Sequence, residues 1–198
     1  MKEELKYLVI DTSLENITNL NLFIGNKSTN IIYDESRAHL KNLILGIKEI
    51  LERSNLKISD LNFISINEGP GSWTGLRIGY ATLKVFAYIN KLPLITYNNF
   101  EIILHKNKIL NGLMLIKSSN VNYYFSLVNE GEVAQKGIIP EAELLLKFPN
   151  LEKFYLEEDL KLIEEVILQK FKNGNFANIF DVEPDYITEG LIISKFEK

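Results

Sequence analysis

The amino-acid sequence predicts an α/β protein in which mixed sheets are flanked by helices. The clearest observation is an apolar strand at 61–67 that runs into the glycine-rich turn GPGSWTG and then into a helix reaching Asn90. Before it, residues 7–34 read as three short strands with a glycine hairpin, which is typical of an antiparallel meander. Residues 39–53 carry leucine and isoleucine at helical spacing, which indicates an amphipathic helix between the two groups of strands.

The alternation of strands and helices continues along the rest of the chain. We expect a strand at 92–97 and a helix from Asn99 to Lys106, with the second half beginning near Asn98. The second half contributes strands at 112–117, at 123–128 and up to Ile139, a short helix from Pro140, a strand at 153–156 and an amphipathic helix at 159–171 that ends at Gly174. These elements predict two lobes, residues 1–97 and a smaller one at 98–198. A duplicated fold is left open, because no sequence repeat supports it.

Composition excludes several classes of site. The chain has 198 residues, a net charge of −4 and no run of lysine and arginine, which argues against unassisted nucleic-acid binding. There is no cysteine, and His39 and His105 are far apart, so neither a thiolate site nor a histidine-rich metal site is expected. The apolar run at 7–10 is too short for a signal peptide or a membrane span. A cytoplasmic protein is therefore the expectation.

The glycine-rich turn is the most constrained part of the backbone. Its structural residues are Gly69, Pro70, Gly71, Ser72, Thr74 and Gly75. Ser72 and Thr74 stand where a helix needs an N-cap, and they could otherwise contact a phosphate; capping is the favoured interpretation. The turn places free backbone amides and the positive end of the helix dipole at the N-terminus of the helix, where an anion could bind. It is not a Walker A loop, because Leu76 follows Gly75 where lysine is required.

Two other polar positions carry competing interpretations. Asp11-Thr12-Ser13 ends the first strand and could bind a metal-bound phosphate, but a polar turn is favoured. His39 begins the first helix, where a cap or a packed surface histidine is the default. A catalytic triad of Ser72, His39 and Asp11 has no support from spacing, and the turn lacks the GxSxG elbow of serine hydrolases.

The helix at 73–90 is apolar on more than one side. One predicted face holds Ile78, Thr82, Val85 and Ile89, with Ala81 at its edge. A second face holds Trp73, Leu76, Tyr80, Ala87 and Tyr88, with Arg77 and Lys84 among them. Because one face suffices to cover a sheet, the other is expected to meet a partner chain or the helix at 39–53, and both alternatives stay open.

The motifs resemble those of the bacterial TsaB family, formerly described as YeaZ or glycoprotease-like proteins. The matching positions are Ile10-Asp11-Thr12-Ser13, His39, GPGSWTGLRIG at 69–79, Leu92-Pro93-Leu94 and Glu101. The resemblance extends over about residues 5–105 and implies an actin/Hsp70-like (ASKHA) fold of two lobes with a trimmed second lobe. It also implies a role in threonylcarbamoylation of adenosine at tRNA position 37.

The same resemblance implies partners rather than chemistry. A TsaB-like chain is a non-catalytic scaffold that binds a TsaD-like paralogue through its first two helices, with a TsaE-like ATPase joining and tRNA reached only through the complex. The implied interface residues are His39, Trp73, Leu76, Arg77, Tyr80, Lys84 and Tyr88. Asp11, Thr12 and Ser13 would be a vestigial phosphate loop. No cofactor of its own is implied, although ATP or ADP at the seam with TsaD is left open, as is a homodimer when the chain is alone.

Departures from the family keep alternatives open. Lys117-Ser118-Ser119 and Asn122-Tyr123-Tyr124 replace the usual Asp-Ala-Arg and Glu-Val-Tyr patterns, and Thr188 replaces an arginine after Pro184-Asp185-Tyr186-Ile187. The main alternative is an ATPase or small-molecule kinase of the actin-like superfamily, with Asp11 organising a metal and the turn at 69–75 touching phosphate. Against it, no aspartate begins an Asp-x-Gly loop. A peptidase lacks both a metal pair and a nucleophile elbow.

Overall fold

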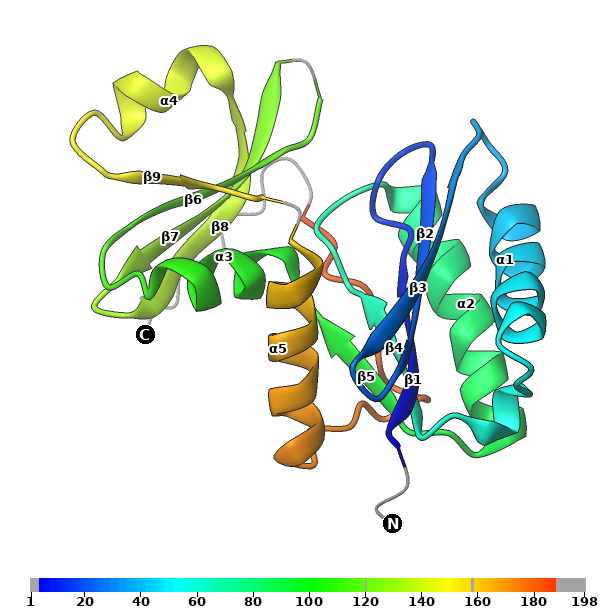
Figure 1. Ribbon diagram of the computed structural model, residues 1–198. Helices are drawn as coiled ribbons and strands as arrows, with labels where there is room; N and C mark the ends of the chain where they lie inside the picture. The colour runs from blue at the N-terminus through cyan, green and yellow to red at the C-terminus, as the bar shows by residue number, and fades with distance from the viewer. Residues whose placement is uncertain (1–3, 120, 158, 188–198) are drawn as a thin grey trace. The chain divides into compact units, whose positions relative to one another are not determined.

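The computed structural model describes residues 4–119, 121–157 and 159–187, and it divides into two compact units (Figure 1). The first unit is Met1–Tyr97 together with Ile167–Pro184, and the second is Asn98–Val166 together with the residues from Asp185 onward. The sequence-based division put all of 98–198 into one lobe. The structure instead places the segment at 167–184 in the first unit. Thr188 lies outside the described residues.

The first unit is built on a five-stranded mixed sheet with the order β3-β2-β1-β4-β5. Its strands are β1 (Lys6–Asp11), β2 (Ile17–Ile24), β3 (Lys27–Asp34), β4 (Phe63–Asn67) and β5 (Leu94–Tyr97). The first three strands form the expected antiparallel meander, whereas β1, β4 and β5 run parallel. Parallel strands need crossover connections, and helices supply them here.

One face of this sheet is covered by α1 (His39–Arg53) and α2 (Trp73–Asn90), and a short 3₁₀ helix, η1 (Ile58–Asp60), precedes β4. Alternate strand residues such as Leu8, Ile10 and Leu20 are fully buried against these helices. Leu43 of α1 and Leu83 of α2 complete the same core. The helical spacing in the sequence thus corresponds to real burial on α1.

The opposite face of the sheet carries a row of stacked aromatic rings. Tyr7 lies between Phe23 and Phe63, with ring centroids 4.7 and 4.6 Å apart, and Phe63 in turn stacks on Phe171 at 4.7 Å. Phe176 meets the edge of Phe171. The stack of Phe171 on Phe63 ties the end of the last helix to the sheet of the first unit.

The second unit repeats the topology with one strand fewer among the described residues. Its strands are β6 (Gly112–Lys117), β7 (Asn122–Asn129), β8 (Glu132–Pro140) and β9 (Lys153–Tyr155), in the order β8-β7-β6-β9. Its helices are α3 (Asn99–Asn107), α4 (Glu141–Lys147) and α5 (Leu160–Lys172), of which α5 ends in the first unit. As in the first unit, a meander is followed by a helix and a strand parallel to the first strand. This shared order is what a duplicated fold requires.

Candidate functional site

The polar turn after β1 is held by hydrogen bonds within the chain. Asp11 Oδ1 accepts a hydrogen bond from the Ser13 amide at 2.7 Å, and Asp11 Oδ2 accepts one from Asn67 Nδ2 at 2.7 Å. Asn67 ends β4, the neighbouring parallel strand, and its Oδ1 accepts from the Gly69 amide at 2.8 Å. Asp11 therefore ties the ends of two strands to the start of the glycine-rich turn.

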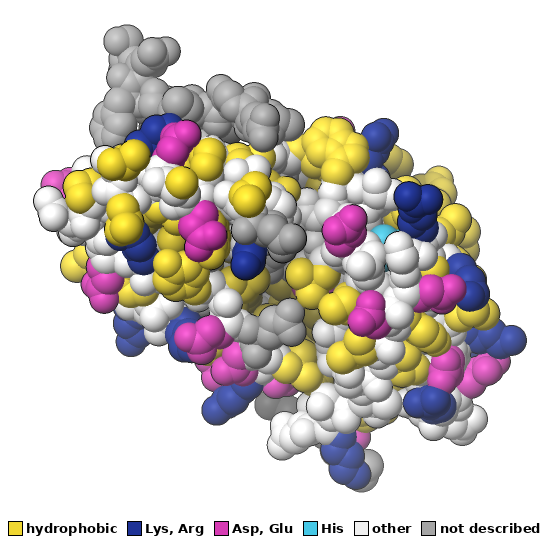
Figure 2. Space-filling model, turned by 90° about the horizontal axis from the view of Figure 1, so that it is seen from above, with side chains coloured by type: hydrophobic (Ala, Val, Ile, Leu, Met, Phe, Trp, Pro, Cys, Tyr) yellow, Lys and Arg dark blue, Asp and Glu magenta, His cyan; other side chains and the backbone are white. Residues whose placement is uncertain are grey.

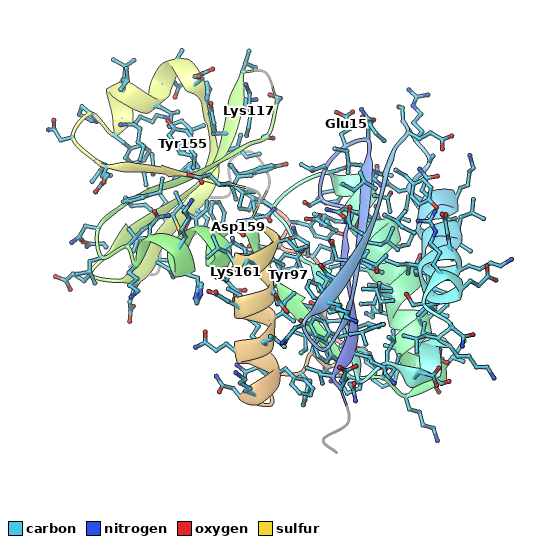
Figure 3. All side chains as sticks on the ribbon, viewed as in Figure 1. Glu15, Tyr97, Lys117, Tyr155, Asp159 and Lys161 are labelled. Atoms are coloured by element: carbon cyan, nitrogen blue, oxygen red, sulfur yellow. The ribbon has the colours of Figure 1, made fainter. Side chains whose placement is uncertain are left out.

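Tyr97, at the end of β5, belongs to the same polar cluster (Figure 3). Burial raises the pKa of the Tyr97 phenol well above its ordinary value, and the charge and hydrogen bonding of Asp11 raise it further. A hydrogen bond with Asn67 opposes these effects by lowering the pKa. The cluster therefore keeps a neutral phenol beside the Asp11 carboxylate.

The glycine-rich turn packs directly on this polar turn. A Cβ added at Gly71 would overlap the backbone oxygen of Ser13, and one added at Gly75 would overlap the backbone oxygen of Thr12. The Ser72 amide donates to the Ser13 carbonyl at 2.6 Å, which closes the contact. The glycines are thus required by the close approach of two segments of this chain. The peptide bond between Gly69 and Pro70 is cis.

Ser72 is the N-cap of α2, as the favoured interpretation of the sequence required. Its Oγ accepts a hydrogen bond from the Gly75 amide at 3.3 Å. Thr74, the other capping candidate, is exposed in the first turn of α2.

His39 is buried, which corrects its assignment to a partner surface. Its Nε2 lies 2.8 Å from the carbonyl oxygen of Glu15, so this nitrogen donates and Nδ1 accepts from the Thr18 hydroxyl at 3.0 Å. Figure 3 marks Glu15 in the turn between β1 and β2. Both ring nitrogens of His39 and both oxygens of Asp11 are engaged elsewhere, so no Ser72–His39–Asp11 triad is formed.

The structure also corrects the predicted orientation of α2. Leu76 and Tyr80 are only 1% and 3% exposed, because they point into the core of the first unit rather than outward. Gly75 and Gly79 lie on the same side, against the turn that contains Thr12. The buried face of α2 is therefore the one that contains these glycines, together with Leu83 and Ala87.

The outward face of α2 is nevertheless apolar. We define the exposed stripe as Trp73, Val85, Tyr88 and Ile89 of α2 together with Leu40 and Ile44 of the neighbouring helix α1. Tyr88 is 63% exposed, and Arg77 lies over the Trp73 ring, 5.9 Å from its centroid. Trp73, Arg77 and Tyr88 thus keep an outward position, as the sequence predicted for them. Val85 and Ile89, which the sequence pattern assigns to the other face, are exposed as well.

Lys84 is engaged by the chain itself. Its Nζ donates hydrogen bonds to the carbonyl oxygens of Val182 at 3.2 Å and Phe180 at 3.5 Å. The assignment of Lys84 to a partner interface is corrected accordingly, because its ammonium group holds the C-terminal segment of the first unit.

The segment of the second unit that departs from the family pattern forms an aromatic corner. Tyr123 of β7 meets Tyr155 of β9 edge to face, with ring centroids 6.1 Å apart. Burial, followed by the nearby charge of Glu141, raises the pKa of the Tyr123 phenol. Lys117 is exposed at the end of β6, and Figure 3 labels it with Tyr155.

The arrangement of charged side chains bears on metal binding and on nucleic-acid binding. Among the described residues, no cluster of three or more histidine, aspartate or glutamate side chains could hold a metal ion. On the face shown in Figure 2, the charged side chains that are drawn mix both signs without a continuous basic surface. Of the helices in the described residues, none combines the length and apolar character needed to cross a membrane.

Comparison with known proteins identifies relatives in tRNA modification. The chain is 34% identical over 97 residues to the tRNA threonylcarbamoyladenosine biosynthesis protein TsaB of Haemophilus influenzae, which covers 49% of this chain and 41% of that protein. It is 42% identical over 66 residues to a tRNA N6-adenosine threonylcarbamoyltransferase of Wolbachia pipientis, which covers 33% of this chain and 20% of the relative. The chain thus spans less than half the length of these curated relatives.

The fold has a close structural counterpart. YeaZ from Pseudomonas aeruginosa superposes with a TM-score of 0.67 over 92% of this chain and 100% of that one, at 15% sequence identity. A second Pseudomonas aeruginosa structure, described as similar to the peptidase YEAZ, gives 0.69 over 93% of this chain. With the two mixed sheets, this likeness confirms the predicted actin/Hsp70-like fold.

A family model supplies the assignment. The model described as TsaD, tRNA N6-adenosine threonylcarbamoyltransferase, matches residues 30–155, and the TsaB and YeaZ relatives confirm the resemblance that the motifs predicted. Because the matched residues make up more than half of the sequence, the chain belongs to the TsaD family of tRNA N6-adenosine threonylcarbamoyltransferases.

Proposed function

We propose that the chain is a non-catalytic scaffold subunit of a complex that installs threonylcarbamoyl on adenosine at tRNA position 37. Its main partner is a TsaD-like transferase, which carries the chemistry. The proposal draws on the relatives in threonylcarbamoyladenosine biosynthesis and on the geometry of the first unit.

The observation that carries the proposal is the exposed stripe on α1 and α2. Six large apolar side chains lie on two adjacent helices, and the charged residues of α2 beside them are Arg77 and Lys84, of which Lys84 is bonded to the chain itself. An exposed apolar patch on adjacent elements is a mark of an interaction surface. Its aromatic members Trp73 and Tyr88 are of the type that dominates binding energy.

A separate catalytic site within this chain has little to support it. The Asp11 carboxylate, the candidate metal ligand of the ATPase alternative, is already bonded by Ser13 and Asn67. In the glycine-rich turn, the Gly69 amide donates to Asn67 and the Ser72 amide donates to the Ser13 carbonyl, so these two amides are not free for a phosphate. Any ATP or ADP is therefore assigned to the seam with the TsaD-like partner. Contacts with a TsaE-like ATPase, access to tRNA only through the complex and a cytoplasmic location belong to the same proposal.

The decisive test combines binding and activity. The chain is co-purified with the TsaD-like transferase of its own organism, and tRNA modification is measured in vitro with and without it. We expect a stable complex and loss of modification when the chain is omitted. The proposal fails if the transferase neither binds the chain nor needs it. ATP turnover by the purified chain alone would instead favour the kinase or ATPase alternative.

A variant locates the surface. Tyr88→Asp places a charge in the exposed stripe and is expected to abolish the complex while the chain stays folded. Leu146→Asp is a matched control, because Leu146 is a highly exposed apolar residue on α4 of the second unit. Equal loss of binding in both variants would contradict the assignment.

A further inference from the structure

The C-terminal segment of the first unit forms a strap, which we define as Phe176–Val182. Its backbone is anchored where the Ala177 amide donates to the Leu94 carbonyl of β5 at 2.8 Å. Side chains of Ala177, Ile179 and Val182 pack against the core beneath α1 and α2. The strap is therefore an integral part of the first unit.

A tight turn inside the strap is fixed from two sides. The Val182 amide donates to the Asn178 carbonyl at 2.9 Å, and the Phe180 amide donates to Asn178 Oδ1 at 3.1 Å. From outside the strap, Lys84 donates to the carbonyls of Phe180 and Val182. Lys84 lies one helical turn before Tyr88, so this clamp fixes the strap beside the exposed stripe.

Phe180 is the unexplained member of the strap. Its ring points outward, 72% exposed, and meets Tyr88 edge to face with centroids 6.0 Å apart. Folding gains little from an aromatic ring held mostly in water, because the hydrophobic gain follows the area removed from water. The clamp nevertheless positions this ring at the border of the stripe.

We propose that Phe180 extends the docking surface for the TsaD-like transferase from α1 and α2 onto the strap, and that Lys84 is the residue that positions it. This inference rests on the proposed function. The surface is continuous, since Phe180 contacts Tyr88 directly. Sequence similarity indicates the transferase as the binding partner, because this chain is 42% identical over 66 residues to such a transferase. Two related chains can pair through equivalent helices in a near-twofold arrangement.

Binding of the intact chain to the purified transferase tests the proposal, with the dissociation constant measured by calorimetry. Phe180→Ser is expected to weaken binding about tenfold or more, as expected for an aromatic anchor. Lys84→Met, which removes the clamp, is expected to weaken it about threefold while the melting temperature stays close to that of wild type. The control is Ile32→Ser, at an exposed apolar position on β3, which should bind as wild type.

The double variant separates positioning from general damage. If Lys84 acts through Phe180, Lys84→Met has little further effect in the Phe180→Ser background. Independent, additive losses would overturn the role of Lys84. If Phe180→Ser does not fold, the binding loss of Lys84→Met decides the proposal.

The binding results distinguish the role of Phe180 from the proposed scaffold function. Wild-type affinity in Phe180→Ser, combined with loss in Tyr88→Asp, overturns the strap but keeps the proposed function. No binding by the wild-type chain overturns both. An effect of Phe180→Ser on self-association alone would overturn the transferase as occupant, in favour of a second copy of the chain.

Discussion

At the level of single residues, Asp11 acts as a structural link. Replacing Asp11 by Asn puts an amide beside the Ser13 and Asn67 donors, so at least one donor loses its acceptor. We expect Asp11→Asn to lower the free energy of unfolding by about 1–3 kcal/mol. Urea unfolding of the purified chain measures this change.

The control for this prediction is Asp34→Asn at an exposed position at the end of β3. It should change the free energy of unfolding by less than about 0.5 kcal/mol. If Asp11→Asn is as neutral as this control, and especially if it stabilises the chain, the carboxylate is held for a ligand and the structural interpretation is wrong.

Ionisation of Tyr97 is expected to lower the stability of the folded chain at alkaline pH. Burial, with the charge of Asp11, raises its folded-state pKa, whereas the unfolded chain has the ordinary value of about 10. The stabilisation is complete below about pH 10 and is lost as pH rises from there toward the folded-state pKa, because the unfolded state releases the proton first. We expect Tyr97→Phe to lose stability less steeply than wild type between about pH 9.5 and 11.

Urea unfolding at a series of pH values measures these slopes. Tyr88→Phe removes an exposed phenol and leaves Tyr97 in place, so it should follow the wild-type slope. A wild-type slope in Tyr97→Phe would mean that another group causes the pH dependence.

At the level of elements, the start of α2 depends on glycines that allow close packing. Gly75→Ala would push a methyl group into the Thr12 carbonyl oxygen, which belongs to the backbone and cannot rotate away. We expect a loss of about 1–3 kcal/mol in the free energy of unfolding. Thr74→Ala, one residue earlier and exposed, should be nearly neutral or stabilising. Thermal melts compare the two variants, and equal stability would mean that the turn is free to move away from Thr12.

Local signals in the sequence predicted this element well. The strand before the turn, the cap at Ser72 and the helix ending at Asn90 are all observed, because turn chemistry and capping depend on neighbouring residues. The sequence did not predict which face of α2 packs against the sheet. Leu76 and Tyr80 were placed outward because a helix with apolar residues on most sides does not show by periodicity alone which face meets the sheet.

A signal for the correct orientation was present in Gly75 and Gly79. Two glycines one turn apart mark a face that another backbone or side chain approaches closely, and here that neighbour is Thr12. The strap had no such signal. Its anchors, Leu94 and Lys84, lie more than eighty residues away in sequence from Ala177 and Val182, so no local pattern could indicate them.

At the level of the whole molecule, each unit buries its own core around a mixed sheet, and the second sheet repeats the strand order of the first with one strand fewer among the described residues. In the first unit, α2 uses one face for that core, and the remaining face keeps the exposed stripe. Burial on folding therefore does not account for the apolar residues at Val85, Tyr88 and Ile89. The proposed partner would account for them, because association removes the same kind of surface from water.

When the TsaD-like partner is absent, the exposed stripe is available to a second copy of the chain. We expect reversible dimers through a twofold contact, which would put Tyr88 into the interface twice. At about 2 kcal/mol for each of the two buried copies of Tyr88, a total of about 4 kcal/mol, Tyr88→Asp should raise the dimer dissociation constant roughly 700-fold. Sedimentation velocity over a concentration series measures this constant, and added transferase should convert dimers into the mixed complex if both use one surface. Two results would contradict this prediction: dimers that persist in Tyr88→Asp, or dimers that bind the transferase without dissociating. Either result would mean that the chain self-associates through a different surface and that the exposed stripe binds only the transferase.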